Sequence, residues 1–199
     1  RYSTPEGVAA LELRGVEVKG PGVGTDGHHF SKVTRACISM GNHSDGGHVI
    51  VGLDDKDLQG MQPGLDSETV ATWLDFDTIS ARMAEYADPP LGFRLDTREL
   101  STGAVVAVFE VSEFPDLPHI CVKDYSGVLR RGALYVRTRK MPETAEIASA
   151  DEMRELLDLA TVKRLRAFVT VAERAGVELV GEPSDEDRFK AERDRAWDD

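Results

Sequence analysis

The sequence predicts an α/β domain, because short strand-like segments alternate along the chain with segments of helical periodicity. The apolar run HVIVGL at residues 48–53 indicates a central strand buried on both faces. FRLDTREL and AVVAVFEV, separated by a turn at Ser101-Thr102-Gly103, are typical of a β-hairpin. The expected helices cover residues 30–40, residues 67–87 with a break near Asp75, and residues 149–176. At 199 residues, the chain is long enough to bury a sizeable core.

The first expected strand is Val16-Glu17-Val18-Lys19. Its alternation of apolar and charged residues places Glu17 and Lys19 on one face. Further strands are expected near residues 119–123 and 133–137.

The helix expected at residues 30–40 has an apolar stripe of Phe30, Val33, Ala36, Cys37 and Met40, with Lys32 and Arg35 outside it. In the next helix the candidate core positions are Val70, Trp73, Leu74, Ile79, Met83 and Tyr86. Residues 1–157 are expected to form the main domain, residues 158–180 a helical extension and residues 181–199 a charged tail.

The charge distribution limits how the chain could bind nucleic acid. A net charge of −12 argues against nonspecific coating of a polyanion, which requires clustered Lys and Arg. Residues 119–174 nevertheless carry 11 Lys and Arg against 8 Asp and Glu, so one local basic face is compatible with the sequence. A solvated hairpin with scattered charges is the alternative.

Cysteine usage and hydropathy favour a cytoplasmic protein. Cys37 and Cys121 lie far apart among apolar neighbours, which indicates reduced thiols in the core. No apolar run approaches the roughly 18 residues that a membrane-spanning helix needs, so we expect no membrane association.

The acidic residues near the first two strands suggest a metal site. Glu12, Glu17, Asp54 and Asp55 lie near expected strand ends, and Lys19 follows Glu17 by two positions. Carboxylates can hold Mg²⁺ or Mn²⁺, and a lysine beside them suits the phosphate of a cleaved phosphodiester. In a plainer interpretation Glu12 caps or pairs locally, Glu17 and Lys19 form a solvent-facing strand edge, and the aspartates only end a strand.

Three motifs carry a family resemblance through their order and spacing. They are GVEVKG, the turn from Asn42 through Gly46-Gly47 into VIVGLDD, and LYVRTRKMPETAEI. Together they resemble the AlbA-like domain of the Schlafen family over residues 8–157. The turn is longer than the family's usual Asn-Thr-x-Gly-Gly, and the zinc-binding residues of animal Schlafens are absent, which favours a zinc-free module of the bacterial type.

The resemblance implies a curved mixed β-sheet flanked by helices, with a nucleic-acid groove. In nuclease-active Schlafens three acids form a metal-dependent site, and by motif position these correspond to Glu12, Glu17 and the Asp54-Asp55 pair. The residues expected to contact nucleic acid are Lys19, Lys32, Arg35, Arg137, Arg139 and Lys140.

Three functions therefore remain open. The first is a Schlafen-like endoribonuclease that cleaves structured, tRNA-like RNA with Mg²⁺ or Mn²⁺, in a role such as phage defence. The second is a noncatalytic DNA- or RNA-binding regulatory domain of a longer protein. The third is a protein-interaction module, and homodimer formation is open in each case.

Overall fold

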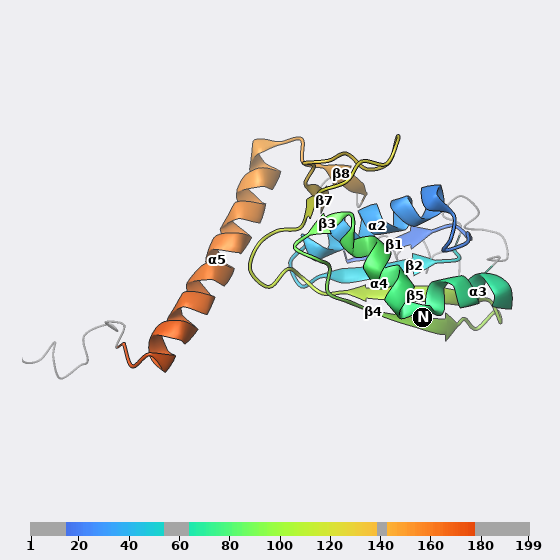
Figure 1. Ribbon diagram of the computed structural model, residues 1–199, viewed down its shortest axis with the longest axis horizontal. Helices are drawn as coiled ribbons and strands as arrows, with labels where there is room; N and C mark the ends of the chain where they lie inside the picture. Colours follow the sequence, from blue (N-terminus) through green and yellow to red (C-terminus); the bar gives the residue numbers. More distant parts are fainter. Residues whose placement is uncertain (1–14, 54–63, 139–142, 178–199) are drawn as a thin grey trace, which may run out of the picture. The chain divides into compact units, whose positions relative to one another are not determined.

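A four-stranded mixed sheet forms the centre of the fold (Figure 1). The computed structural model describes residues 15–53, 64–138 and 143–177. The strand order is β1 (Val16–Lys19), β2 (Gly47–Val51), β5 (Val105–Val111) and β4 (Phe93–Glu99). β1 runs parallel to β2, and the other two pairings are antiparallel. The expected α/β class is confirmed, and β4 and β5 form the expected hairpin.

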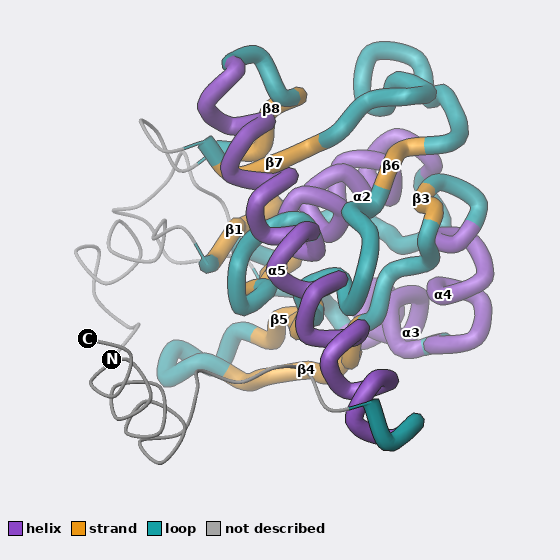
Figure 2. Tube along the Cα trace, turned by 90° about the vertical axis from the view of Figure 1, so that its left-hand side faces the viewer, coloured by secondary structure: helices purple, strands orange, loops and turns teal. Residues whose placement is uncertain are grey.

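Three helices cover one face of this sheet, as Figures 1 and 2 show from two sides. They are α2 (Gly27–Gly41), α3 (Ser67–Leu74) and α4 (Phe76–Ala84). Alternate strand residues point toward the helices, because side chains in a strand alternate between the two faces. The main core therefore joins Val49, Val51, Ala107, Phe109 and Val111 of the sheet to Phe30, Val33, Cys37, Trp73, Ile79 and Met83 of the helices.

Two small sheets lie outside the main one. β3 (Ala87–Asp88) pairs with β6 (Ile120–Cys121), and β7 (Tyr135–Arg137) pairs with β8 (Thr144–Glu146), both antiparallel. The β7–β8 pair packs against α2. Because α2 also packs against β2, this helix connects the main sheet to the β7–β8 sheet.

Aspartate side chains fix the helix starts. The carboxylate of Asp26 accepts hydrogen bonds from the backbone amides of His28 and His29 at the start of α2. Asp75 ends α3 and caps α4, since its side chain accepts a hydrogen bond from the Thr78 amide at 3.2 Å. This capping explains the break that the sequence predicts near Asp75.

The last described helix, α5 (Ala150–Arg174), has the expected signals at both ends. The Ser149 hydroxyl accepts from the Glu152 amide, and the Glu152 carboxylate accepts from the Ala148 amide, which is a variant of the capping box shifted by one residue. Gly176, at φ 71°, follows the helix in the left-handed region. The chain divides into two compact units, Arg1–Ala160 and Thr161–Asp199.

Two expectations about individual elements are wrong, and one described strand was not expected. β2 is buried on one face only, because His48 is exposed and Ile50 is half-buried. Leu74 is 47% exposed, since the chain turns at Asp75 before that position can reach the core. β8 was not expected, because its three residues are too few for a recognisable alternation.

The cysteines agree with the expectation of core thiols. Cys37 and Cys121 are both free and buried, and burial raises the pKa of each thiol. Among the described residues, no helix combines the length and the apolar character needed to span a bilayer.

A candidate nucleic-acid interface around Glu17 and Arg35

Glu17 lies on β1, one of the two edge strands of the main sheet as described, and its side chain points to the side covered by α2. The residue is 7% exposed. One carboxylate oxygen accepts hydrogen bonds from the Arg137 guanidinium and the Thr144 hydroxyl, and the other accepts from the Lys19 ammonium. Arg137 also donates to the carbonyl of Val16 at 3.0 Å. Glu17 therefore connects β1 to β7 and β8 through buried, charge-assisted hydrogen bonds.

This network revises two expectations from the sequence. Glu17 is buried, so its alternation with Lys19 does not mark a solvent-facing strand edge. The sequence also predicts that Arg137 contacts nucleic acid. Its side chain is only 1% exposed, however, and its guanidinium neutralises Glu17 inside the protein. Lys19 keeps 24% of its side chain exposed and remains accessible to a phosphate.

The described residues alone do not form a divalent-metal site. Glu17 already faces two cationic groups, and no three His, Cys, Asp or Glu side chains gather at any point of the described ranges. The other predicted ligands, Glu12, Asp54 and Asp55, lie outside those ranges. The described chain reaches Leu53, whose amide donates to the carbonyl of Lys19 at 3.1 Å.

Thr144 links the Glu17 network to α2. Its carbonyl accepts a hydrogen bond from the Arg35 guanidinium at 3.1 Å. Because the Thr144 hydroxyl donates to Glu17, the buried Ser39 hydroxyl must be the donor in its 3.0 Å contact with Thr144. The sequence gives no signal for this role, since Thr144 lies on the unexpected strand β8 and contacts residues more than 100 positions earlier.

The outer face of α2 carries a cationic stripe, defined here as Lys32 and Arg35. His28 lies four residues before Lys32 and Arg35 lies three after it, so all three are on the same side of the helix. His28 and Lys32 are exposed and Arg35 is half-buried. Lys32 and Arg35 were expected to contact nucleic acid, and both lie outside the apolar stripe of α2. Arg139 and Lys140, expected for the same role, lie outside the described residues.

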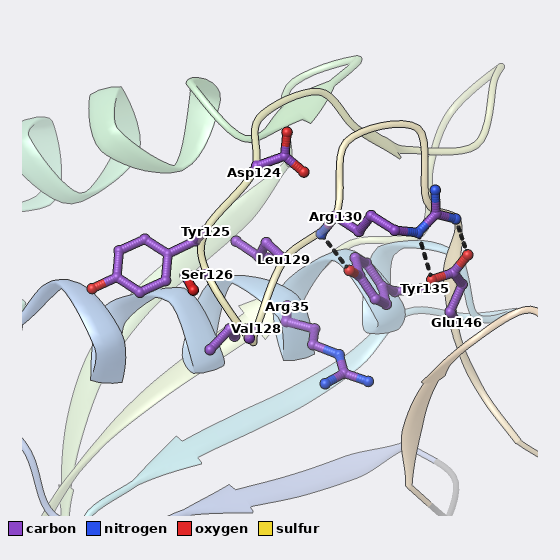
Figure 3. A pocket seen from close by; sticks show the side chains of 10 residues that line it. Arg35, Asp124, Tyr125, Ser126, Val128, Leu129, Arg130, Tyr135 and Glu146 are labelled. Carbon is purple, nitrogen blue, oxygen red and sulfur yellow. Dashed lines mark hydrogen bonds and ion pairs between the residues drawn. The ribbon is translucent and has the colours of Figure 1, made fainter.

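A pocket of about 440 Å³ adjoins the cationic stripe at Arg35. Figure 3 shows the side chains around it. Arg130 pairs with Glu146 on one side, and the Arg130 amide donates to the Tyr135 hydroxyl at 2.8 Å. The Arg35 guanidinium lies over the Tyr135 ring, 5.0 Å from its centroid. The lining is Arg35, Asp124, Tyr125, Ser126, Gly127, Val128, Leu129, Arg130, Tyr135 and Glu146.

Asn42, at the C-terminal end of α2, fixes the backbone behind this pocket. Its amide nitrogen donates to the carbonyls of His119 and Tyr135 at 2.9 and 3.0 Å, and its carbonyl accepts from the His119 amide at 2.8 Å. In the sequence Asn42 opens the turn that leads to Gly46-Gly47, and an asparagine side chain often bonds the backbone of its own turn. Asn42 instead joins α2 to two segments that are 77 and 93 residues away.

His119 is buried, and burial lowers its pKa below the usual value. Its Nδ1 lies 2.7 Å from the carbonyl of Pro89, and its buried Nε2 has no partner among the described residues. Protonation of the ring would place an N–H group at Nε2 without an acceptor, which is costly in the interior.

We predict that His119 makes the protein less stable in weak acid. The pKa of His119 is lower in the folded state than in the unfolded state. The neutral ring therefore contributes stability at high pH. This contribution is lost as the pH falls below about 6.5, the pKa of the ring in the unfolded chain. Urea titrations between pH 8 and pH 5 should show a falling free energy of unfolding, with a shallower fall in His119→Gln. Burial also lowers the pKa of His29, so part of the slope should remain in the variant. An unchanged slope in His119→Gln would contradict the assignment.

Comparisons with known proteins support only the fold. No family model and no curated protein matches the sequence. The solved structure of the DIP2311 protein from Corynebacterium diphtheriae is similar, with a TM-score of 0.50 and 18% sequence identity, over 71% of this chain and 26% of that one. The chain thus corresponds to about a quarter of the length of DIP2311.

Proposed function

We propose that this chain is a nucleic-acid-binding domain of the Schlafen AlbA-like type. The main support is the cationic stripe of α2, which presents Lys32 and Arg35 beside a pocket with aromatic walls. Bound nucleic acid is held largely by Lys and Arg on its phosphates, and exposed aromatic rings can stack on its bases. The four-stranded mixed sheet covered by helices agrees with the fold that the sequence motifs imply.

The net charge of −12 is compatible with this proposal because binding depends on local charge. Two carboxylates near the stripe already have partners. Glu146 pairs with Arg130, and the Asp124 carboxylate accepts a hydrogen bond from the Arg131 amide. Lys32 is therefore an exposed cation on a surface where neighbouring acids are partly compensated.

Metal-dependent cleavage of structured RNA is a second candidate function, supported by the parallel pairing of β1 and β2. Glu17 and Lys19 are on β1, and the amides of Gly52 and Leu53 donate to the carbonyl of Lys19 just before Asp54-Asp55 in the sequence. A nuclease would need Mg²⁺ or Mn²⁺ to neutralise the phosphate and activate water, with Glu12, Glu17 and an aspartate as ligands.

Binding is tested by fluorescence anisotropy at low salt with labelled tRNA and duplex DNA. We expect the native protein to bind at least one of them, and Lys32→Glu to weaken binding about tenfold, a typical effect of reversing a charge that contacts phosphate. Arg94→Glu is the matched control, because Arg94 is exposed on β4 and points to the opposite face of the sheet. Equal weakening by both variants would contradict the proposed surface. If the native protein binds neither probe, the proposal is rejected and a protein-interaction module remains as the alternative.

Cleavage is tested separately by incubating tRNA with Mn²⁺. The decisive variant is Asp54→Asn combined with Asp55→Asn, because replacing the buried Glu17 would also disturb the fold. Cutting by the native protein that is lost in this variant would support the nuclease. Equal background in both proteins would reject cleavage while leaving the binding proposal intact.

A further inference from the structure

The pocket beside Arg35 differs from the cationic stripe in its charge and its surface. Its walls include two tyrosines, Tyr125 and Tyr135, and two buried aliphatic side chains, Val128 and Leu129. Its volume of about 440 Å³ lies within the range of small-ligand sites. It can therefore receive a flat, largely apolar group.

The charges in the pocket favour an uncharged occupant. The Arg130 guanidinium is neutralised by Glu146 in a two-pronged ion pair, and Asp124 adds a carboxylate at the rim. A phosphate entering the pocket would meet both carboxylates, whereas an uncharged ring would not. Lys32, one helical turn before Arg35 on α2, offers a phosphate an exposed cation outside the pocket.

Arg35, which lines the pocket, has one donor without a partner among the described residues. The Nε atom of Arg35 is buried and has no hydrogen-bond partner among the described residues, while another nitrogen of the same guanidinium donates to Thr144. A carbonyl or ring nitrogen of a ligand could accept from this guanidinium. The rim also offers the Ser126 hydroxyl and the Asp124 carboxylate, which can accept from an exocyclic amino group.

From this geometry we propose that the pocket receives one unpaired base of a bound nucleic-acid strand, with the adjacent phosphate on Lys32. The inference rests on the proposed nucleic-acid binding and adds the form of the ligand. A base inside a duplex is stacked and paired, so only an unpaired or flipped base can enter. Tyr135 is only 3% exposed and lies under the Arg35 guanidinium. Tyr125 is half-buried on a short turn, with its ring 6.2 Å from that of His28, and is the lining tyrosine that a base can reach.

The test compares a single-stranded RNA with a duplex of the same sequence by fluorescence anisotropy. Tyr125→Leu keeps an apolar side chain and removes the ring, so single-strand affinity should fall about 5- to 150-fold, as expected for one base–aromatic stack. Duplex affinity should change less than about twofold, since phosphate contacts dominate there. Tyr125→Phe should retain single-strand binding. Phe76→Leu, which removes an aromatic ring that is 45% exposed on α4, is the control.

The outcomes separate this inference from the proposed function. If the native protein binds neither these RNAs nor the tRNA and duplex DNA of the first test, the proposed function fails and the inference fails with it. If it binds only duplex DNA, the proposed function stands and the inference alone is overturned. If it binds both and Tyr125→Leu matches the native protein, only the inference is overturned. It is also overturned if Tyr125→Leu weakens single-strand and duplex binding equally, or if free nucleotides bind while the single strand does not.

Discussion

Replacing Arg137 by methionine is expected to lower the free energy of unfolding by about 3–5 kcal/mol, the cost of removing one partner of a buried ion pair. Among the described residues, the Glu17 carboxylate would keep Lys19 and Thr144 as its remaining partners and would stay buried. Urea denaturation at pH 7 measures this loss.

A double variant identifies the cause of that loss. Glu17→Met combined with Arg137→Met removes both buried charges, so it should be more stable than Arg137→Met alone. Lys19 can then turn its partly exposed ammonium to water. If the free energy of unfolding of the double variant falls by the full sum of the losses in Glu17→Met and Arg137→Met, the ion pair is not the connection between β1 and β7.

Replacing Asn42 by alanine is expected to cost about 3 kcal/mol or more. Three buried backbone groups, the amide and carbonyl of His119 and the carbonyl of Tyr135, would lose their partner, and each such loss costs about 1–3 kcal/mol.

Asn42→Asp gives a sharper result. It keeps the acceptor for the His119 amide but turns a carboxylate oxygen toward two carbonyls. At pH 7 this variant should be at least as unstable as Asn42→Ala, and acid should partly restore it, because a protonated carboxyl can donate again. A stable Asn42→Asp protein at pH 7 would contradict the assigned donor role.

Much of the fold could be predicted because its signals are local. The alternation of Val16-Glu17-Val18-Lys19 predicts β1, and the apolar spacing from Phe30 to Met40 predicts the buried face of α2. The break at Asp75 and the capping box at Ser149 are likewise short-range features. β8 escaped prediction because it is short, and its pairing with β7 depends on the packing of both against α2.

The candidate site was predicted less completely, since its contacts join distant parts of the chain. Glu17 and Lys19 lie on one face of β1, as expected. No spacing rule predicts that Glu17 meets Arg137, 120 residues later, or that this arginine is buried. The pocket also combines side chains from α2, the turn at Tyr125 and both β7 and β8, so it exists only in the folded chain.

The central claim is that the cationic stripe on α2 contacts phosphate. The salt dependence of RNA binding tests this claim most directly. A plot of log K against log salt concentration should have a negative slope for the native protein. In Lys32→Ala the magnitude of the slope should fall by about 0.7–0.9, the contribution of one lost phosphate contact. Arg94→Ala should leave the slope unchanged. Identical slopes for all three proteins, or binding that does not respond to salt, would contradict the claim.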